Sequence, residues 1–210
     1  IVAVGTSNYA GAGLDLNFAD QDARAMADAL RQTGAPLFGA DSVSVYLLTT
    51  DATNSDSLPS KKQIEAAFDA IRQRAKAEDV LVAYFSGHGL SYGDADRALF
   101  YYLTMELSSD KLDDAGLRAQ RAISSQELTR WINDIPAQKQ VLILDACNSG
   151  RVVENLAAGR KELNPSQIRA LDRLKDRTGM FVLTGSAADK VSFEAGCFAQ
   201  GLLTYSLLEG

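Results

Sequence analysis

The only histidine of this 210-residue chain, His88, stands between two glycines in Tyr-Phe-Ser-Gly-His-Gly, directly after an apolar run of strand length. A second apolar run leads into Asp-Ala-Cys-Asn-Ser-Gly and so to Cys147. A thiolate is a strong nucleophile, and a nearby imidazole can take its proton or stabilise the ion pair. The two residues therefore predict a Cys–His pair if the two strands are neighbours. Taken alone, each has a structural alternative: a loop histidine and a packed thiol.

The glycine after the histidine has a chemical interpretation as well. Gly89 would let a substrate backbone approach closely and would direct its amide at a developing oxyanion, with the Cys147 amide as the second donor.

Apolar segments of strand length alternate with amphipathic helical segments along the chain. Strands are expected at residues 1–6, 42–49, 80–85, 98–103 (as part of a hairpin), 141–144 and 180–184. Helices are expected at residues 20–31 and 202–208 and after two capping boxes, Ser60 with Gln63 and Ser124 with Glu127. This order predicts an α/β fold with a mostly parallel sheet covered by helices on both faces.

Composition narrows the class of partner. The net charge of −6 and the pI of about 4.8 disfavour nucleic acid and mildly favour cationic peptides. No apolar run approaches the roughly 20 residues that cross a bilayer, so a membrane is not expected as a partner. Two cysteines do not make a disulfide scaffold, so a reducing, cytoplasmic location is expected. Cys197 has no motif around it and is interpreted as structural. The chain begins inside a strand and is expected to be part of a longer protein.

Four stretches resemble the caspase-like cysteine peptidases, in particular the metacaspase-like branch that includes bacterial orthocaspases. "VLVAYFSGHG" and "VLILDACNSG" are similar to the family's histidine and cysteine motifs, and the cysteine follows the histidine by 59 residues. "LNFADQDARAMADAL" is similar to the family's first helix, and "GLLTYSLLEG" to the helix near the end of its small subunit. The nucleophile motif differs from the Gln-Ala-Cys-Arg-Gly of animal caspases, and Asn148 stands where the metacaspase-like branch often has histidine.

The resemblance implies one caspase-like domain over residues 1–210, a three-layer sandwich. A large-subunit-like part would span about 1–150, a linker about 151–178 and a small-subunit-like part about 179–210. It implies a cysteine endopeptidase with Cys147 as nucleophile and His88 as proton shuttle, acting on protein or peptide substrates without a cofactor. Calcium binding is not supported by a clear motif, because the candidate acids match no compact calcium loop and are interpreted as solvated: Asp94, Asp96, Asp110, Asp113 and Asp114.

The acidic residues near Cys147 predict which substrate side chain the peptidase prefers. Asp145 lies two residues before the nucleophile, and a carboxylate in the substrate pocket would pair with a guanidinium or an ammonium group and repel an acid. By the resemblance, Asp22 and Ser86 line the same pocket, and cleavage after Arg or Lys is expected. The alternative for Asp22 is an acid in the first turn of a helix, where the helix dipole favours it.

Three other interpretations stay open at this stage. The peptidase could have a non-basic preference, or the domain could be a catalytically weak or inactive interaction scaffold, although an intact His88 and Cys147 speak against a scaffold. A flavodoxin-like nucleotide binder lacks support, since "GTSNYAGAG" fits neither phosphate-loop spacing.

The linker is rich in basic residues and is expected to be partly helical after Pro165. A peptidase that prefers basic residues is expected to cut itself there, at Arg160-Lys161, because the neighbouring Gly159 and Asn164-Pro165 favour a turn.

Overall fold

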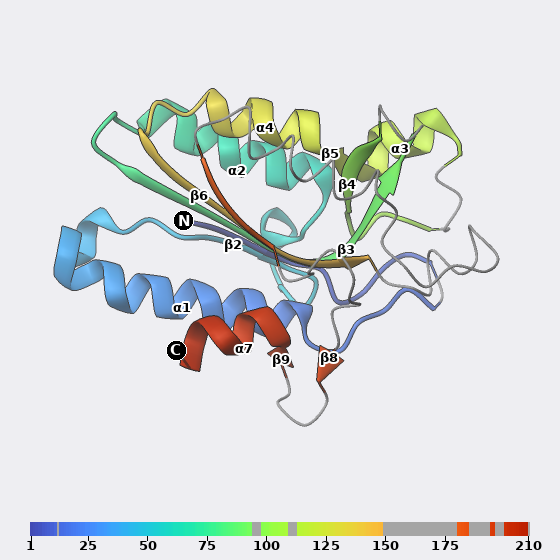
Figure 1. The fold of residues 1–210 in the computed structure, drawn as a ribbon, viewed down its shortest axis with the longest axis horizontal. Coiled ribbons are helices and arrows are strands. Elements are labelled where there is room, and N and C mark those ends of the chain that lie inside the picture. Colours follow the sequence, from blue (N-terminus) through green and yellow to red (C-terminus); the bar gives the residue numbers. More distant parts are fainter. Residues whose placement is uncertain are drawn as a thin grey trace.

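The computed structural model describes residues 1–11, 13–93, 98–108, 113–148, 180–184, 194–195 and 200–209, and at Cys147 and Asn148 it describes the backbone. Seven strands of these residues form one central sheet, and helices cover both of its faces (Figure 1). The α/β class expected from the sequence is therefore confirmed.

Five strands run parallel, in the spatial order β2, β1, β3, β6, β7. Their bounds are β1 (Val2–Gly5), β2 (Tyr46–Thr49), β3 (Val80–Tyr92), β6 (Lys139–Asn148) and β7 (Phe181–Thr184). The antiparallel additions are β4 (Leu99–Leu103), which pairs with the end of β3, and β5 (Ala122–Ser124), which pairs with β4. A separate small sheet consists of β8 (Glu194–Ala195) and β9 (Gln200–Gly201).

The helices form the two outer layers (Figure 1). On one face lie α2 (Lys61–Arg74) and α4 (Ser125–Asn133), and on the other α1 (Ala19–Phe38) and α7 (Leu202–Glu209). The remaining helical segments are α3 (Ala115–Arg121), beside β4 and β5, and the single turns η1 (Ala40–Ser42) and η2 (Ser55–Ser57). Alternation along β3 divides the core, because Phe85 packs in the cluster under α2 and α4 while Tyr84 packs against α1.

The two central strands are longer than the sequence predicts. β3 continues past Phe85 to Tyr92, and β6 continues past Leu144 to Asn148, so His88 lies inside a strand and not in a loop after one. The reason is pairing. β4 returns antiparallel along the end of β3 and β6 runs along its other side, so polar and glycine residues there still have ladder partners.

One of the two capping boxes is complete. Ser124 accepts a hydrogen bond from the Glu127 amide, and the Glu127 side chain accepts one from the Ser124 amide. Ser60 accepts from the Gln63 amide at 3.3 Å, but the Gln63 side chain donates instead to Asp56, also at 3.3 Å. The capping box that starts at Ser60 is therefore only half formed.

Other boundaries differ by a few residues. The helix expected at residues 20–31 extends to Phe38, and the strand expected from residue 42 begins at Tyr46 because residues 40–42 form η1. The basic linker, the helix expected after Pro165 and Cys197 lie outside the described residues. Among the helices of the described part, none is long and apolar enough to cross a membrane.

Candidate active site

The two predicted motifs lie side by side because β3 and β6 are neighbours in the parallel sheet. His88 is in register with Cys147, and Ser86 is in register with Asp145 two residues earlier. Adjacent strands are about 4.8 Å apart, so the backbone positions of each pair are close. The condition set by the sequence, that the two strands be neighbours, is met.

The imidazole of His88 is held by a backbone carbonyl. Its ring is buried, and Nε2 lies 2.6 Å from the carbonyl oxygen of Leu14, in the segment between β1 and α1. A carbonyl oxygen only accepts hydrogen bonds, so Nε2 must bear the proton. In the neutral imidazole Nδ1 then has the lone pair, which is the arrangement that a general base requires.

Tyr9 fixes the backbone on which this histidine stands. The His88 amide donates to the Tyr9 hydroxyl at 2.9 Å, and the two rings lie 5.0 Å apart between centroids. Burial, reinforced by the nearby Tyr102, raises the pKa of Tyr9 well above its ordinary value. Tyr9 therefore stays a neutral phenol. It positions the His88 backbone and does not act as a phenolate that would take a proton from the imidazole.

Gly89 is a position where a side chain does not fit. It is in register with Asn148 of β6 and Tyr102 of β4, and a Cβ atom there would lie 2.5 Å from the Phe100 ring. Close packing against an aromatic ring thus explains the glycine. The expected oxyanion roles of the Gly89 and Cys147 amides stay predictions.

The three expected pocket residues come together on the α1 face of the sheet. Asp22 of α1 and Asp145 of β6 are 2% and 5% exposed, and the Ser86 hydroxyl lies 3.5 Å from the Asp22 carboxylate, near the limit of a hydrogen bond. Ser86 and His88 are two residues apart on β3, so they lie on the same face. The acid pair is therefore next to the Cys–His register pair.

The start of α7 binds both acids. The Gly201 amide donates to the Asp22 carboxylate at 3.0 Å, and the Thr204 amide and hydroxyl donate to Asp145 at 3.2 Å and 2.6 Å. A Cβ atom at Gly201 would lie 2.6 Å from an Asp145 oxygen and 3.0 Å from an Asp22 oxygen. The two carboxylates thus converge on one point, and only a glycine fits between them.

Burial and neighbouring charge shift the pKa values of groups at the acid pair. Burial raises the pKa of the Asp145 carboxyl, although the hydrogen bonds from Thr204 oppose the rise. Burial, together with the charges of Asp145 and Asp22, raises the pKa of Tyr84 well above its ordinary value. The Tyr84 and Thr204 hydroxyls are also hydrogen-bonded to each other. Because the Thr204 hydroxyl donates its hydrogen bond to the Asp145 carboxylate, the Tyr84 hydroxyl must be the donor to Thr204.

Comparison with known proteins gives the family. A family model described as the caspase domain matches residues 1–210. The chain belongs to the caspase family. Metacaspase-3 of Arabidopsis thaliana is 30% identical over 162 residues, which are 76% of this chain and 42% of that protein. This caspase domain therefore spans less than half the length of that relative.

Solved structures agree on the fold. The crystal structure of a protein from Geobacter sulfurreducens superposes with a TM-score of 0.63, at 17% identity, over 99% of this chain and 79% of that one. At this identity the likeness concerns the fold alone, and it supports a caspase-like arrangement. Together with the metacaspase relative, the family match identifies a caspase-family cysteine peptidase domain.

Sequence reasoning missed several groups that position the site residues of this caspase domain. The Leu14 carbonyl is a backbone atom, so no residue type announces it. Thr204 and Gly201 lie within the quoted stretch "GLLTYSLLEG", but nothing local links them to acids 59 and 179 residues away. Tyr9 is the positioning residue that the sequence could have revealed, because it is the only aromatic residue in "GTSNYAGAG".

The metal candidates of the sequence receive no support as a group. Asp114 accepts hydrogen bonds from two amides and caps α3, and Asp94, Asp96 and Asp110 lie outside the described residues. In the described ranges no cluster of three or more His, Cys, Asp or Glu side chains is arranged to hold a metal ion.

Replacing Thr204 by valine tests the link between α7 and Asp145. Thr204→Val removes the hydroxyl that stabilises the Asp145 carboxylate, so the pKa of Asp145 should rise further, as measured by an NMR titration of its carboxyl carbon. A lost hydrogen bond to a buried charged group should also lower the free energy of unfolding by about 1 to 3 kcal/mol. Thr33→Val, at an exposed position of α1, is the control and should change neither quantity measurably. An unchanged Asp145 pKa would contradict the described contact.

Proposed function

We propose that this caspase domain is a cysteine endopeptidase in which Cys147 and His88 hydrolyse the peptide bond. The observation that supports this most directly is the orientation of His88. Its Nε2 is held by the Leu14 carbonyl, and its backbone is in register with Cys147 on the next strand. Family membership supports the same chemistry.

The mechanism follows from the two residue types. The neutral His88 takes the thiol proton at Nδ1, and the Cys147 thiolate attacks the scissile carbonyl carbon. The resulting oxyanion is stabilised by backbone amides, for which Gly89 and Cys147 are the candidates. Collapse breaks the C–N bond, the amine leaves with the proton from His88, and a thioester remains. Water then hydrolyses the thioester, giving up a proton to His88 and restoring the thiol.

Substrate preference is proposed from the acid pair. Asp145 and Asp22 approach each other in a buried site, and the hydrogen-bond partners described for Asp145 are neutral groups. Two converging buried carboxylates repel each other, and a guanidinium or ammonium group that approaches them from the side away from Gly201 would relieve that repulsion. An ionised Asp145 carboxylate still has acceptor capacity beyond its two bonds from Thr204. We therefore propose cleavage after Arg or Lys, with Ser86 lining the pocket.

Removing either member of the pair should abolish activity. Cys147→Ala, His88→Ala and the double variant should each lower kcat/KM on an Arg-containing peptide on the order of 10³-fold or more, and the double variant should be little worse than either single one. Cys197→Ala should keep activity near the wild-type level. A thiol-directed peptidyl electrophile should label the wild type and not Cys147→Ala. Full activity of Cys147→Ala would rule out the assignment, and a wild type inert to both substrate and electrophile would indicate an interaction scaffold.

Neutralising Asp145 tests the preference. Asp145→Asn should lower kcat/KM after Arg and Lys by the equivalent of about 2 kcal/mol or more, because the buried cation loses its partner. Since only ionised Asp145 attracts a cation and its pKa is raised, wild-type cleavage should fall with decreasing pH before the ordinary Asp range is reached. Asp28→Asn, on the exposed surface of α1, serves as the control. Equal wild-type cleavage after Asp and Arg would show that the charge argument is wrong.

Self-cleavage follows from the same preference. We expect the wild type to cut its own linker after Arg160 or Lys161, whereas Cys147→Ala should stay intact. Mass spectrometry of both purified chains measures this, with two fragments that meet near residue 160 as the expected result. A wild-type chain that is intact and fully active would exclude processing as a requirement.

A further inference from the structure

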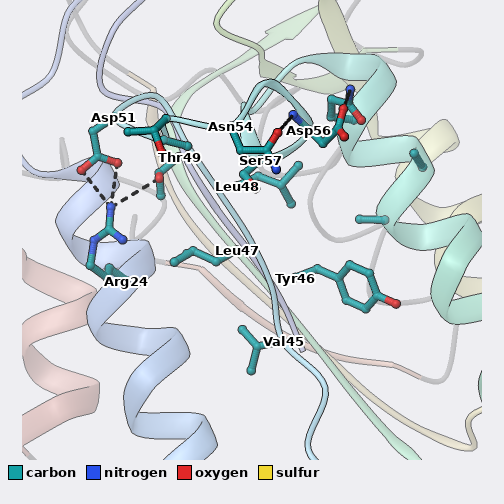
Figure 2. Close-up of a pocket in the computed structure, with 15 residues that line it drawn as sticks. Arg24, Val45, Tyr46, Leu47, Leu48, Thr49, Asp51, Asn54, Asp56 and Ser57 are labelled. Carbon is teal, nitrogen blue, oxygen red and sulfur yellow. Dashed lines mark hydrogen bonds and ion pairs between the residues drawn. The ribbon is translucent and has the colours of Figure 1, made fainter.

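β2 is an edge strand of the sheet, and a groove runs along its open side between α1 and α2 (Figure 2). The groove has a volume of about 740 Å³. It is lined by β2, by Arg24 of α1, by Ala66 and Ala67 of α2, and by residues of the 51–57 segment beyond the end of β2. β1 separates this surface, which we call the β2 groove, from β3, so the groove is two strands, about 10 Å, from the proposed catalytic strand.

The backbone of β2 is oriented to accept another strand. The Tyr46 amide donates to the Ile1 carbonyl at 2.9 Å, so the backbone groups of Tyr46 point toward β1. Alternation then points those of Leu47 and the amide of Thr49 toward the open edge, whereas the Thr49 carbonyl accepts a hydrogen bond from the Ala52 amide at 3.2 Å. In the part of the chain that the structure describes, β1 is the strand that pairs with β2. An edge of this kind is a template for an extended segment.

The side chains of the β2 groove divide into an apolar part and an acidic end. Tyr46 is half-buried and Ala66 is exposed, and together they leave apolar surface on the α2 side. At the other end, Arg24 neutralises Asp51 through a 2.7 Å ion pair. Asp56 accepts a hydrogen bond from Gln63, and among the ion pairs of the described residues none includes Asp56. One carboxylate therefore remains uncompensated by a cation.

We propose that the β2 groove binds an extended segment of a partner protein as an added strand. Main-chain hydrogen bonds to the amide and carbonyl of Leu47 and to the amide of Thr49 supply the pairing. An apolar side chain contacts Tyr46 and Ala66, and a basic side chain reaches Asp56. Residues two or four apart in an extended segment lie on one face, so an apolar and a basic residue at that spacing fit the α2 side together. This site lies apart from the proposed active site and does not depend on its activity.

Charge favours a basic partner over a second copy of this chain. The chain has a net charge of −6, so two copies repel each other, and β2 is only four residues long. A segment with lysine or arginine is attracted both by Asp56 and by the whole protein.

Binding of a defined probe tests the proposal. The probe is a fluorescein-labelled octapeptide, Val-Val-Lys-Lys-Val-Val-Lys-Lys, blocked at both ends, so that a valine and a lysine stand two residues apart on each face. Its anisotropy is followed during titration with the Cys147→Ala chain, which is not expected to cleave it. Saturable binding is expected. A fully N-methylated peptide of the same sequence, which cannot pair as a strand, should not bind.

Matched variants locate the contact. Asp56→Asn should weaken binding by about two- to fivefold, the usual effect of one exposed ion pair. Asp69→Asn removes the same charge on the outer surface of α2 and should leave affinity unchanged. Ala66→Arg should weaken binding more strongly, because the arginine fills the groove and repels the peptide, while an exposed helical position tolerates it. Circular dichroism and thermal unfolding verify that each variant is folded.

Amide hydrogen exchange identifies the strand that is paired. The probe should slow exchange at Leu47 and Thr49, and this protection distinguishes the β2 groove from the acidic pocket at Asp145. The proposal is overturned if the probe does not bind, if Asp56→Asn and Asp69→Asn behave alike, or if protection falls elsewhere. It is also overturned if sedimentation shows a dimer that Ala66→Arg dissociates, because the occupant would then be a second copy.

Discussion

The parallel ladder between β3 and β6 is the constraint on which the site depends. It joins residues 80–89 to residues 139–148 in unbroken register. Because a parallel ladder fixes each residue against one partner, the same register that aligns the apolar cores of both strands also aligns Ser86 with Asp145 and His88 with Cys147. A slip of one residue would exchange the two faces of a strand and separate every one of these pairs. Core packing and chemistry therefore specify the same alignment.

The acid pair shows how the fold accommodates buried charge. Removing an ionised carboxylate from water is costly unless hydrogen bonds replace the water. Here the amide groups at the start of α7 supply them, and a helix start also attracts negative charge. The carboxylates in turn hold the helix on the α1 face of the sheet. A structural role for Asp22 and Asp145 is thus compatible with the proposed role in substrate binding, because the contacts that dock α7 also orient the two acids.

The sequence predicts the frame of this molecule better than its details. Apolar runs and capping residues reveal the strands and helices. Two polar motifs after such runs predict that His88 and Cys147 meet if their strands are neighbours, and the β3–β6 pairing supplies that condition. Strand length could not be predicted, since residues such as Gly89 become strand only when β4 and β6 pair with them. Groups that act through the backbone, such as the Leu14 carbonyl, are equally hidden because every residue has a carbonyl. Thr204 acts through its side chain, but its hydrogen-bond partner Tyr84 is 120 residues away in the sequence.

That separation has a consequence for the order in which the molecule assembles. Tyr84 and Asp145 can become neighbours as soon as β3 and β6 pair, but Thr204 belongs to the last segment of the described chain. Closing so long a loop costs chain entropy before the contacts that it brings together can stabilise it. A pair as distant in sequence as Tyr84 and Thr204 therefore forms late in folding. The acids would then lack their donors until α7 docks. During synthesis of the chain, the sheet can thus form before the acid pair gains its donors, and a nascent chain from which α7 has not yet emerged lacks the finished acid pair.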